Sequence, residues 1–267
     1  MVAGRRTPIR LSSLSGLERL LAPHGLQPIA PVQRRPFSLV FPAHQAGNGR
    51  ELFVKLLISK SAGVRRNFGR EIEILRVLGG QPGVKALHVA NVDDALTFHA
   101  CERVRGPSLA EVAGAPGSDL AAMLGHARQL TAWIAALHRL GIAHRDLSPD
   151  HVFLEGGRLV VIDFGMAKQT RFLPADERQL CEGYDVQALG MILWEMVCQS
   201  AIFPYRGRGL GAVLQREAAL VREAELPAEV RRVVMGCFAT ASEFMPDGLP
   251  PYSGFTSALQ ALRAFDA

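Results

Sequence analysis

Two aspartates in fixed surroundings constrain this chain more than any other feature. Asp146 lies in the polar stretch His-Arg-Asp-Leu-Ser-Pro-Asp-His at residues 144–151, which indicates a tight loop. Asp163 follows the apolar run at residues 160–162 and precedes Phe-Gly, so it comes directly after an expected strand. The two carboxylates are seventeen positions apart. Such a pair suits a reaction in which one carboxylate accepts a hydroxyl proton and the other binds a hard divalent cation.

These segments resemble the catalytic loop and the metal-binding loop of the protein-kinase superfamily, as an atypical bacterial-type member. The first segment is also similar to the loop of lipopolysaccharide-core sugar kinases and of RIO-like kinases. The resemblance implies transfer of the γ-phosphate of ATP to a hydroxyl acceptor, with Asp146 as catalytic base and Asp163 as the Mg²⁺ ligand. It also implies structural support from Arg145 and from Asp185, which opens the matching stretch Asp-Val-x-x-Leu-Gly.

One position of the catalytic loop departs from the family. Kinases carry an Asn as second metal ligand five residues after the catalytic aspartate, whereas this chain has His151. An imidazole nitrogen is a poorer ligand for Mg²⁺ and a better one for Mn²⁺ or Zn²⁺. Two interpretations stay open: His151 ligates or neighbours an altered metal site, or its imidazole only forms a hydrogen bond within the loop. The lipopolysaccharide-core sugar kinases show a similar exchange.

A lone lysine within an apolar segment supports the same family. Lys55 lies in Leu-Phe-Val-Lys-Leu-Leu at residues 52–57, and a lysine there needs a partner. The family register assigns it to the α- and β-phosphates of ATP and pairs it with Glu71 on the next helix. Glu73 is the rival partner, but two residues along a helix it points to another face.

Residues 98–109 resemble the hinge that connects the two kinase lobes. In that register Cys101 is the gatekeeper, and the backbone groups of Glu102 and Val104 bind the adenine edge. Ser108 completes the set of expected nucleotide-binding residues.

Three further departures argue against ordinary protein-kinase behaviour. The expected phosphate-binding loop, at residues 33–40, contains no glycine, although Arg34 and Arg35 could supply positive charge instead. Phe53 replaces a small residue against the adenine ring, where it would narrow the pocket or stack differently. Ser148 replaces the lysine that protein Ser/Thr kinases place beside the transferred phosphate.

The segment between Asp163 and Asp185 is too short for a full activation and peptide-docking segment. The sequence therefore favours a non-peptide acceptor, or a protein recognised elsewhere. Thr170 is the only hydroxyl residue between Asp163 and Tyr184, and its phosphorylation could order the loop through Arg145. Three functions stay open: a protein Ser/Thr kinase, a lipopolysaccharide or other sugar kinase, and a pseudokinase that serves as a scaffold.

The expected fold class is α+β, with two lobes as in protein kinases: a small N-terminal β-sheet lobe with one main helix, and a larger helical C-terminal lobe. Residues 1–31 are predicted as an N-terminal arm with a short amphipathic helix, residues 32–104 as the N-lobe and hinge, and residues 105–267 as the C-lobe. ATP is expected between the lobes. The patterns predict strands at 37–41, 52–58 and 95–101, and helices at 11–22, 65–78, 119–140, from 185 onward, and at 228–238.

Composition narrows the partners and the compartment. The 267 residues carry a net charge of +5, and 48% are hydrophobic. The charges are spread out, which is typical of arginine-rich proteins; they would also attract phosphate-rich ligands or an anionic membrane face. Four scattered cysteines indicate neither a zinc site nor a disulfide framework. With no apolar run long enough to cross a membrane, we expect a cytoplasmic protein that binds ATP, Mg²⁺ or Mn²⁺ and a protein or sugar acceptor, but no nucleic acid.

Overall fold

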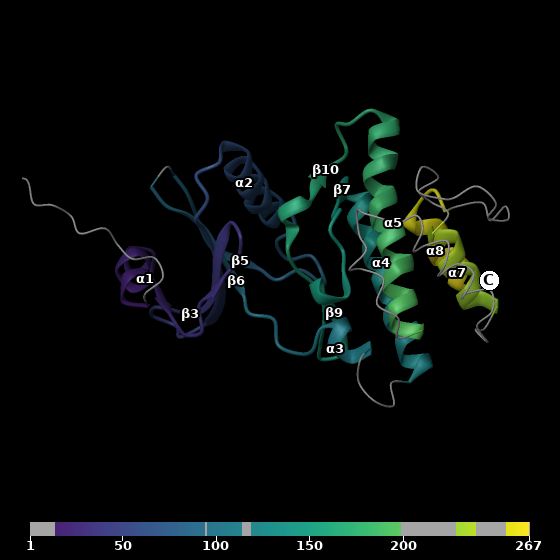
Figure 1. The fold of residues 1–267 in the computed structure, drawn as a ribbon, viewed down its shortest axis with the longest axis horizontal. Helices are drawn as coiled ribbons and strands as arrows, with labels where there is room; N and C mark the ends of the chain where they lie inside the picture. Colours follow the sequence, from purple (N-terminus) through teal and green to yellow (C-terminus); the bar gives the residue numbers. More distant parts are fainter. Residues whose placement is uncertain (1–13, 94, 114–118, 199–227, 239–254, 267) are drawn as a thin grey trace, which may run out of the picture. The chain divides into compact units, whose positions relative to one another are not determined.

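A computed structural model describes residues 14–93, 95–113, 119–198, 228–238 and 255–266 of the chain. The chain divides into two compact units (Figure 1). The first comprises Met1–Gln81 and Lys85–Val104, and the second comprises Pro82–Val84 and Arg105–Ala267. The main division thus falls after Val104, within the segment expected to be a hinge.

The first unit is built on a six-stranded antiparallel sheet in the order β1-β3-β4-β6-β5, with β2 pairing the start of β3. The strands are β1 (Leu26–Pro28), β2 (Gln33–Arg34), β3 (Ser38–Gln45), β4 (Glu51–Leu57), β5 (Leu87–Val92) and β6 (Thr97–Glu102). The predicted strands at 37–41, 52–58 and 95–101 correspond to β3, β4 and β6. The alternation of buried and exposed residues within β4 is the physical reason that this segment forms a half-buried strand.

The two faces of this sheet have different roles. On one face, Leu52, Val54 and Leu56 join the hydrophobic core. Helix α1 (Leu14–Leu21) covers that core with Leu17 and Leu21, which are fully buried. Residues 14–28 therefore belong to the same compact unit as the rest of the sheet, and residue 31 is not a boundary between units. Residues 11–13 of the predicted helix lie outside the described residues.

The opposite face of the sheet carries Lys55, because side chains alternate along a strand. Helix α2 (Ala62–Val77) packs toward this face and buries Phe68, Glu71 and Ile72. The prediction of a helix at 65–78 is confirmed, although α2 begins three residues earlier, after Ser61. Figure 1 shows α1 and α2 on different sides of the strands of this unit.

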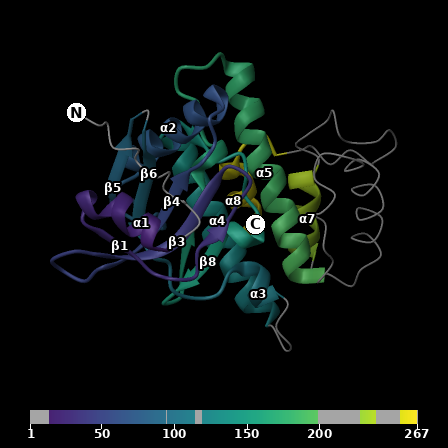
Figure 2. The ribbon, with the colours of Figure 1, turned by 60° about the vertical axis from the view of Figure 1, so that its left-hand side comes forward.

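The second unit is mainly helical (Figure 2). Its core unites α4 (Leu120–Arg139) and α5 (Ala175–Cys198) with α7 (Ala228–Phe238) and α8 (Ala258–Asp266), and the short helix α3 (Leu109–Ala113) packs beside them. The helices predicted at 119–140 and 228–238 are confirmed as α4 and α7. Helix α5 begins ten residues before the predicted start at residue 185, and this earlier start shortens the preceding connection.

Two small antiparallel ladders position the loops of the second unit. Strand β7 (Ile142–Ala143) pairs with β10 (Lys168–Gln169), and β8 (Val152–Glu155) pairs with β9 (Arg158–Val161). The loop around Asp146 leaves β7, and Asp163 follows β9. These ladders therefore fix the ends of both carboxylate-bearing segments. Among the described residues, no helix combines the length and the apolar character that crossing a bilayer requires.

Candidate active site

The loop that carries Asp146 is held by a buried carboxylate of α5. Asp185 is fully buried and accepts hydrogen bonds from the backbone N–H groups of His144 (2.8 Å) and Arg145 (2.6 Å). The Nε2 of His138, on α4, lies 2.9 Å from the same carboxylate. A buried carboxylate is stable when several donors surround it, so this arrangement fixes the loop to two helices. These contacts agree with the supporting role predicted for Asp185, and they add His138, which the sequence patterns do not single out.

His144 stabilises the same loop from within. The backbone N–H of Asp146 donates to Nδ1 of His144 at 3.3 Å, so Nδ1 is an acceptor. The hydrogen therefore lies on Nε2, which donates to the carbonyl oxygen of Ile162 at 3.1 Å. Full burial lowers the pKa of His144, although the charges of Asp185 and Asp146 act in the opposite direction. The neutral imidazole thus links the Asp146 loop to the residue before Asp163.

Both carboxylate-bearing segments contain a strained backbone position. Among the described residues, Arg145 (φ 65°) and Asp163 (φ 63°) are the non-glycine residues with positive φ. Left-handed conformations cost energy for residues with a Cβ atom, and they persist where the surroundings impose them. Arg145 is additionally placed over the ring of Tyr184, at 6.0 Å from its centroid. One strained residue precedes the expected base Asp146 and the other is the expected metal ligand. Backbone strain at such positions is typical of a functional site.

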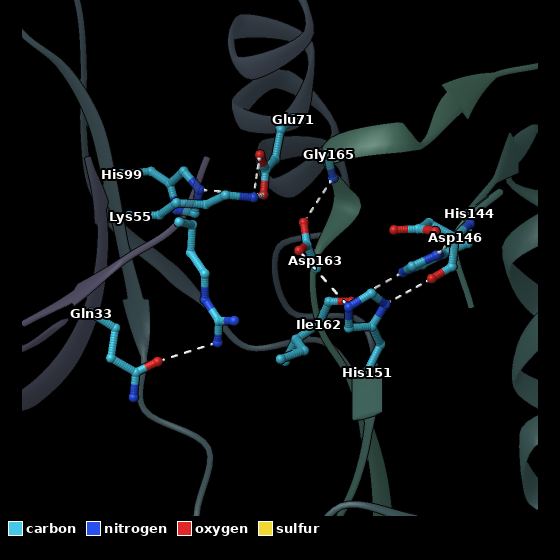
Figure 3. A network of polar contacts seen from close by, with 11 residues as sticks. Gln33, Lys55, Glu71, His99, His144, Asp146, His151, Ile162, Asp163 and Gly165 are labelled. Carbon is cyan, nitrogen blue, oxygen red and sulfur yellow. Dashed lines mark hydrogen bonds and ion pairs between the residues drawn. The ribbon is translucent and has the colours of Figure 1, made fainter. Parts of the chain in front are cut away.

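His151 connects the two segments directly (Figure 3). Its Nδ1 donates to the carbonyl oxygen of Asp146 at 2.7 Å, and its Nε2 lies 4.0 Å from Oδ2 of Asp163. Oδ1 of Asp163 accepts a hydrogen bond from the backbone N–H of Gly165 at 3.3 Å. Each nitrogen of His151 therefore matches one of the two interpretations of this residue: one bonds the loop, and the other faces the carboxylate expected to bind metal.

The donor set suits a nucleotide-bound cation rather than a metal held by protein alone. Within the described residues, no group of three or more His, Cys, Asp or Glu side chains forms a candidate metal site. Asp163 supplies a hard carboxylate ligand, and Nε2 of His151, 4.0 Å from Oδ2 of Asp163, supplies a candidate second ligand atom. A cation that also takes phosphate oxygens and water needs only one or two such protein ligands, so these residues fit the implied metal.

Lys55 and Glu71 form the predicted ion pair in the first unit. The Nζ atom of Lys55 donates to both carboxylate oxygens of Glu71, at 2.9 and 3.0 Å (Figure 3). Glu71 is only 3% exposed, so its charge depends on this partner. Glu73 is exposed on another face of α2, which excludes it as the partner. The pairing is confirmed, and its contact with phosphate stays a prediction.

The expected hinge residues lie at the end of β6, where the first unit ends. Cys101 is partly buried opposite Phe53, and the N–H of Glu102 donates to the carbonyl oxygen of Ala86 at 3.0 Å. Beyond Val104, a Cβ atom on Gly106 would lie 1.9 Å from the carbonyl oxygen of Leu154, so only glycine fits there. The close approach of Gly106 to Leu154 fixes the position of the chain that follows the expected hinge within the second unit.

Ser108 is a buried polar residue with a structural role. It precedes α3, and Oγ accepts from the N–H of Glu111 at 3.2 Å while the N–H of Ser108 donates to the Glu111 carboxylate at 2.7 Å. This reciprocal pattern is a capping box. Nucleotide binding by Ser108 stays a prediction that the geometry does not require.

The segment that replaces a glycine-rich loop is a tight hairpin. Strands β2 and β3 are connected by residues 35–37, and the N–H of Arg35 donates to the carbonyl oxygen of Ser38 at 2.8 Å. Such a short connection has little backbone with which to surround phosphates. Arg34 and Arg35 are exposed, and Arg35 also bonds the side chain of Gln33 at 3.2 Å. Phosphate recognition here would depend on side-chain charge.

Phe53 lies on the same face of β4 as Lys55, because side chains two positions apart on a strand point to the same side of the sheet. Its neighbours across the sheet are Pro42 and Cys101, and it is 39% exposed. An aromatic side chain thus lies across the sheet from Cys101, and its contact with the adenine ring stays a prediction.

The connection between Asp163 and α5 is shorter than a docking segment. After β10, residues 170–174 lead directly into α5, and Ala175-Asp176-Glu177 forms its first turn. Helix α5 then continues without interruption past Asp185. Thr170 is fully buried, and its N–H donates to the carbonyl oxygen of Gly141 at 2.6 Å. Thr170 is therefore poorly placed for regulatory phosphorylation.

Residues 36–177 match the family model described as protein kinase domain, which is more than half of the chain. The chain belongs to the protein kinase domain family. The match covers Lys55, Glu71, Asp146 and Asp163, and it ends in the first turn of α5, where the connection is short. Membership in the kinase family agrees with the α+β fold of the two units.

Curated kinases resemble the chain over parts of their length. CBL-interacting protein kinase 20 of Oryza sativa subsp. japonica is 32% identical over 146 residues, 49% of this chain and 31% of that protein. Probable serine/threonine-protein kinase PkwA of Thermomonospora curvata is 28% identical over 238 residues, 78% of this chain and 30% of that protein. Testis-specific serine/threonine-protein kinase 3 of Mus musculus is 25% identical over 217 residues, 70% of this chain and 78% of that protein. The chain thus spans about a third of the length of the first two relatives.

Proposed function

We propose that this kinase-family chain is an ATP-dependent phosphotransferase that moves the γ-phosphate to a hydroxyl group. The observation that carries the proposal is the link from Asp146 through His151 to Asp163, because it joins a candidate base to a candidate metal ligand. The Lys55–Glu71 pair of the first unit supplies the phosphate-binding cation. The adenine edge of ATP would lie at the backbone of Glu102 and Val104.

The reaction assigns one role to each group. The Asp146 carboxylate accepts the proton of the acceptor hydroxyl as its oxygen forms a bond to the γ-phosphorus. The bond from that phosphorus to the β–γ bridging oxygen breaks, and ADP leaves with the electron pair. Lys55 orients the α- and β-phosphates, and Glu71 holds Lys55. A divalent cation held by Asp163, with His151 as its neighbour, would neutralise the phosphates.

The acceptor has two candidates, each favoured by a specific observation. The names of the relatives, which include serine/threonine-protein kinases, favour a protein hydroxyl. The direct passage from residues 170–174 into α5 favours an acceptor that does not bind as an extended peptide. Ser148, in place of a lysine, and the similarity of residues 144–151 to sugar-kinase loops favour a sugar or another small molecule. We infer a compact acceptor, with a folded protein as the second candidate.

A scaffold without catalysis is the non-enzymatic alternative. The short hairpin at residues 35–37, Phe53 and His151 motivate it. The intact ion pair of Lys55 with Glu71 opposes it, since a buried carboxylate without its partner is costly and a scaffold could replace both residues by apolar ones. The strained backbone at Arg145 and Asp163 also opposes it.

Thermal unfolding with and without nucleotide tests the proposal. A ligand that binds only the folded protein raises the melting temperature, by an amount that grows with ligand concentration over Kd. Mg-ATP or Mn-ATP should raise it in the wild-type chain and much less in Lys55→Met. If neither complex changes the melting temperature of the wild-type chain, nucleotide binding is wrong and the scaffold becomes the better account.

A further inference from the structure

His99 is a buried polar residue that the proposed chemistry does not use. It lies on β6 directly opposite Lys55 on β4, and it is 7% exposed. Its ring packs on Phe68 of α2, with centroids 5.3 Å apart. A histidine in this position is enclosed by the strand that carries the phosphate-binding lysine and by the helix that carries its glutamate. A buried imidazole needs polar partners, so its two nitrogens are informative.

One nitrogen of His99 faces the ion pair. Nε2 lies 3.4 Å from Oε1 of Glu71, the oxygen that also accepts from Lys55 at 2.9 Å (Figure 3). The contact lacks the direction of a formed hydrogen bond, and Nε2 is otherwise without a hydrogen-bond partner among the described residues. A small rotation of either side chain would complete the bond. Nε2 must carry a hydrogen here, because a lone pair directed at a carboxylate would be repelled.

The other nitrogen of His99 has a partner that favours the same tautomer. Nδ1 lies 3.7 Å from Sγ of Cys101, two residues along β6. Burial, reinforced by the negative charge of Glu71, raises the pKa of Cys101 to about 12. Cys101 is therefore a thiol at neutral pH, and its S–H can donate to Nδ1. That bond leaves the hydrogen of the imidazole on Nε2, toward Glu71.

We propose that His99 is a positioning residue that holds the Glu71 carboxylate in place, so that Glu71 orients Lys55 toward the nucleotide phosphates. The role rests on the proposed function, since it acts through the Lys55–Glu71 pair. It adds to that pair a third member from the strand that ends in the hinge. Cys101 contributes by setting the tautomer of His99 and takes no part in chemistry.

A double-mutant cycle with nucleotide affinity as the measurement tests this role. His99→Leu should weaken binding of a non-hydrolysable ATP analogue about tenfold in the otherwise wild-type chain, as expected for loss of a hydrogen bond to a charged group. In the Glu71→Gln background the same substitution should change affinity less than about twofold. His99→Gln, which keeps an N–H donor of similar reach, should restore most of the affinity. His44→Leu, at an exposed position of the same sheet, is the matched control and should have no effect.

Equal losses of affinity from His99→Leu in both backgrounds would overturn the proposal, because they would show a general packing role. Nitrogen NMR of the His99 side chain, assigned by its absence in His99→Gln, should show the Nε2–H tautomer; an Nδ1–H tautomer would also overturn it. If the wild-type chain binds no nucleotide, the affinity cycle cannot be measured, whereas the NMR test of the tautomer still applies. In that case the proposed function fails, and coupling between His99→Leu and Glu71→Gln in urea unfolding supports the contact, whereas additive effects on stability contradict it.

Discussion

His151 Nδ1 donates a 2.7 Å hydrogen bond to the carbonyl oxygen of Asp146, and this bond decides what the other nitrogen can do. Because Nδ1 makes this bond, Nε2 is the nitrogen left to ligate a cation held by Asp163, whose Oδ2 lies 4.0 Å away. An Asn at this position could make both contacts with its amide, one through nitrogen and one through oxygen. The substitution therefore preserves the connection and exchanges an oxygen donor for a nitrogen donor.

His151→Asn should shift metal preference toward Mg²⁺. Nitrogen donors favour Mn²⁺ over Mg²⁺, whereas an amide oxygen suits Mg²⁺. We expect the ratio of the Mg²⁺-supported to the Mn²⁺-supported turnover rate to rise about tenfold, within the range found for changes around metal sites. Turnover measured over a series of concentrations of each metal checks this. His44→Asn, at an exposed position of the sheet, is the control. An unchanged ratio would assign His151 to the hydrogen bond with Asp146 alone.

Lys55→Met should destabilise the fold as well as weaken nucleotide binding. It leaves the Glu71 carboxylate buried without its cation, a change that costs about 3 kcal/mol in the free energy of unfolding. The double variant Lys55→Met/Glu71→Leu should recover most of this loss, because both charged groups are then replaced by apolar ones. Urea unfolding of the wild-type chain, the two single variants Lys55→Met and Glu71→Leu, and the double variant provides the measurement. A destabilisation in the double variant as large as in Lys55→Met would show that the buried charge is not the cause.

His144 should make stability fall with acidity. Burial lowers the pKa of His144 in the folded protein. Below about pH 6.5, the unfolded chain therefore binds a proton at this residue and the folded chain does not. The contribution of His144 is therefore fully present above pH 6.5 and declines below it, by at most about 1.4 kcal/mol per pH unit, until the lowered folded pKa is reached. Urea unfolding from pH 8 to pH 5 should show a steeper decline for the wild-type chain than for His144→Asn. Parallel curves would contradict this assignment.

Most of the site could be predicted because its residues lie in short local patterns. Asp146, His151 and Asp163 are fixed by two loops with strong spacing constraints, and Lys55 is conspicuous as the one cation of an apolar strand. Strands β3, β4 and β6 and both helices of the first unit followed from periodicity, whereas β1, β2 and β5 were not predicted. The choice of Glu71 as the partner of Lys55 followed from the resemblance to the kinase family, and the helical period only placed Glu73 on another face.

The parts that escaped prediction depend on contacts between distant segments. His99 and His138 stand in ordinary apolar surroundings in the sequence. Only the packing of α2 beside β6 and of α4 beside α5 reveals their carboxylate partners. The early start of α5 was missed because the polar first turn at residues 175–177 shows no apolar period. The packing of α1 on the sheet was missed because an amphipathic helix does not by itself show what covers its apolar face.

The acceptor should not be an extended peptide. Residues 170–174 and the continuous α5 provide no separate segment for such a chain. Random peptide libraries and generic basic proteins should therefore accept phosphate poorly, while a sugar or cell-envelope extract should contain a better acceptor. Transfer of labelled phosphate, followed by separation of products by size, checks this. Efficient phosphorylation of short peptides with a flanking-sequence preference would contradict the prediction and restore a conventional protein substrate.

Phosphoryl transfer from γ-labelled ATP by Asp146→Asn, together with its ATP affinity, tests the central claim most directly. The variant keeps the size and backbone contacts of the loop but loses the base, so we expect transfer to fall at least about a hundredfold. ATP affinity should stay within about threefold of the wild-type value, because the proposed function assigns Asp146 to the acceptor and not to the nucleotide. Asp150→Asn, at an exposed position of the same loop, should retain wild-type transfer. Substantial transfer by Asp146→Asn, or none by the wild-type chain with either Mg²⁺ or Mn²⁺, would contradict the account.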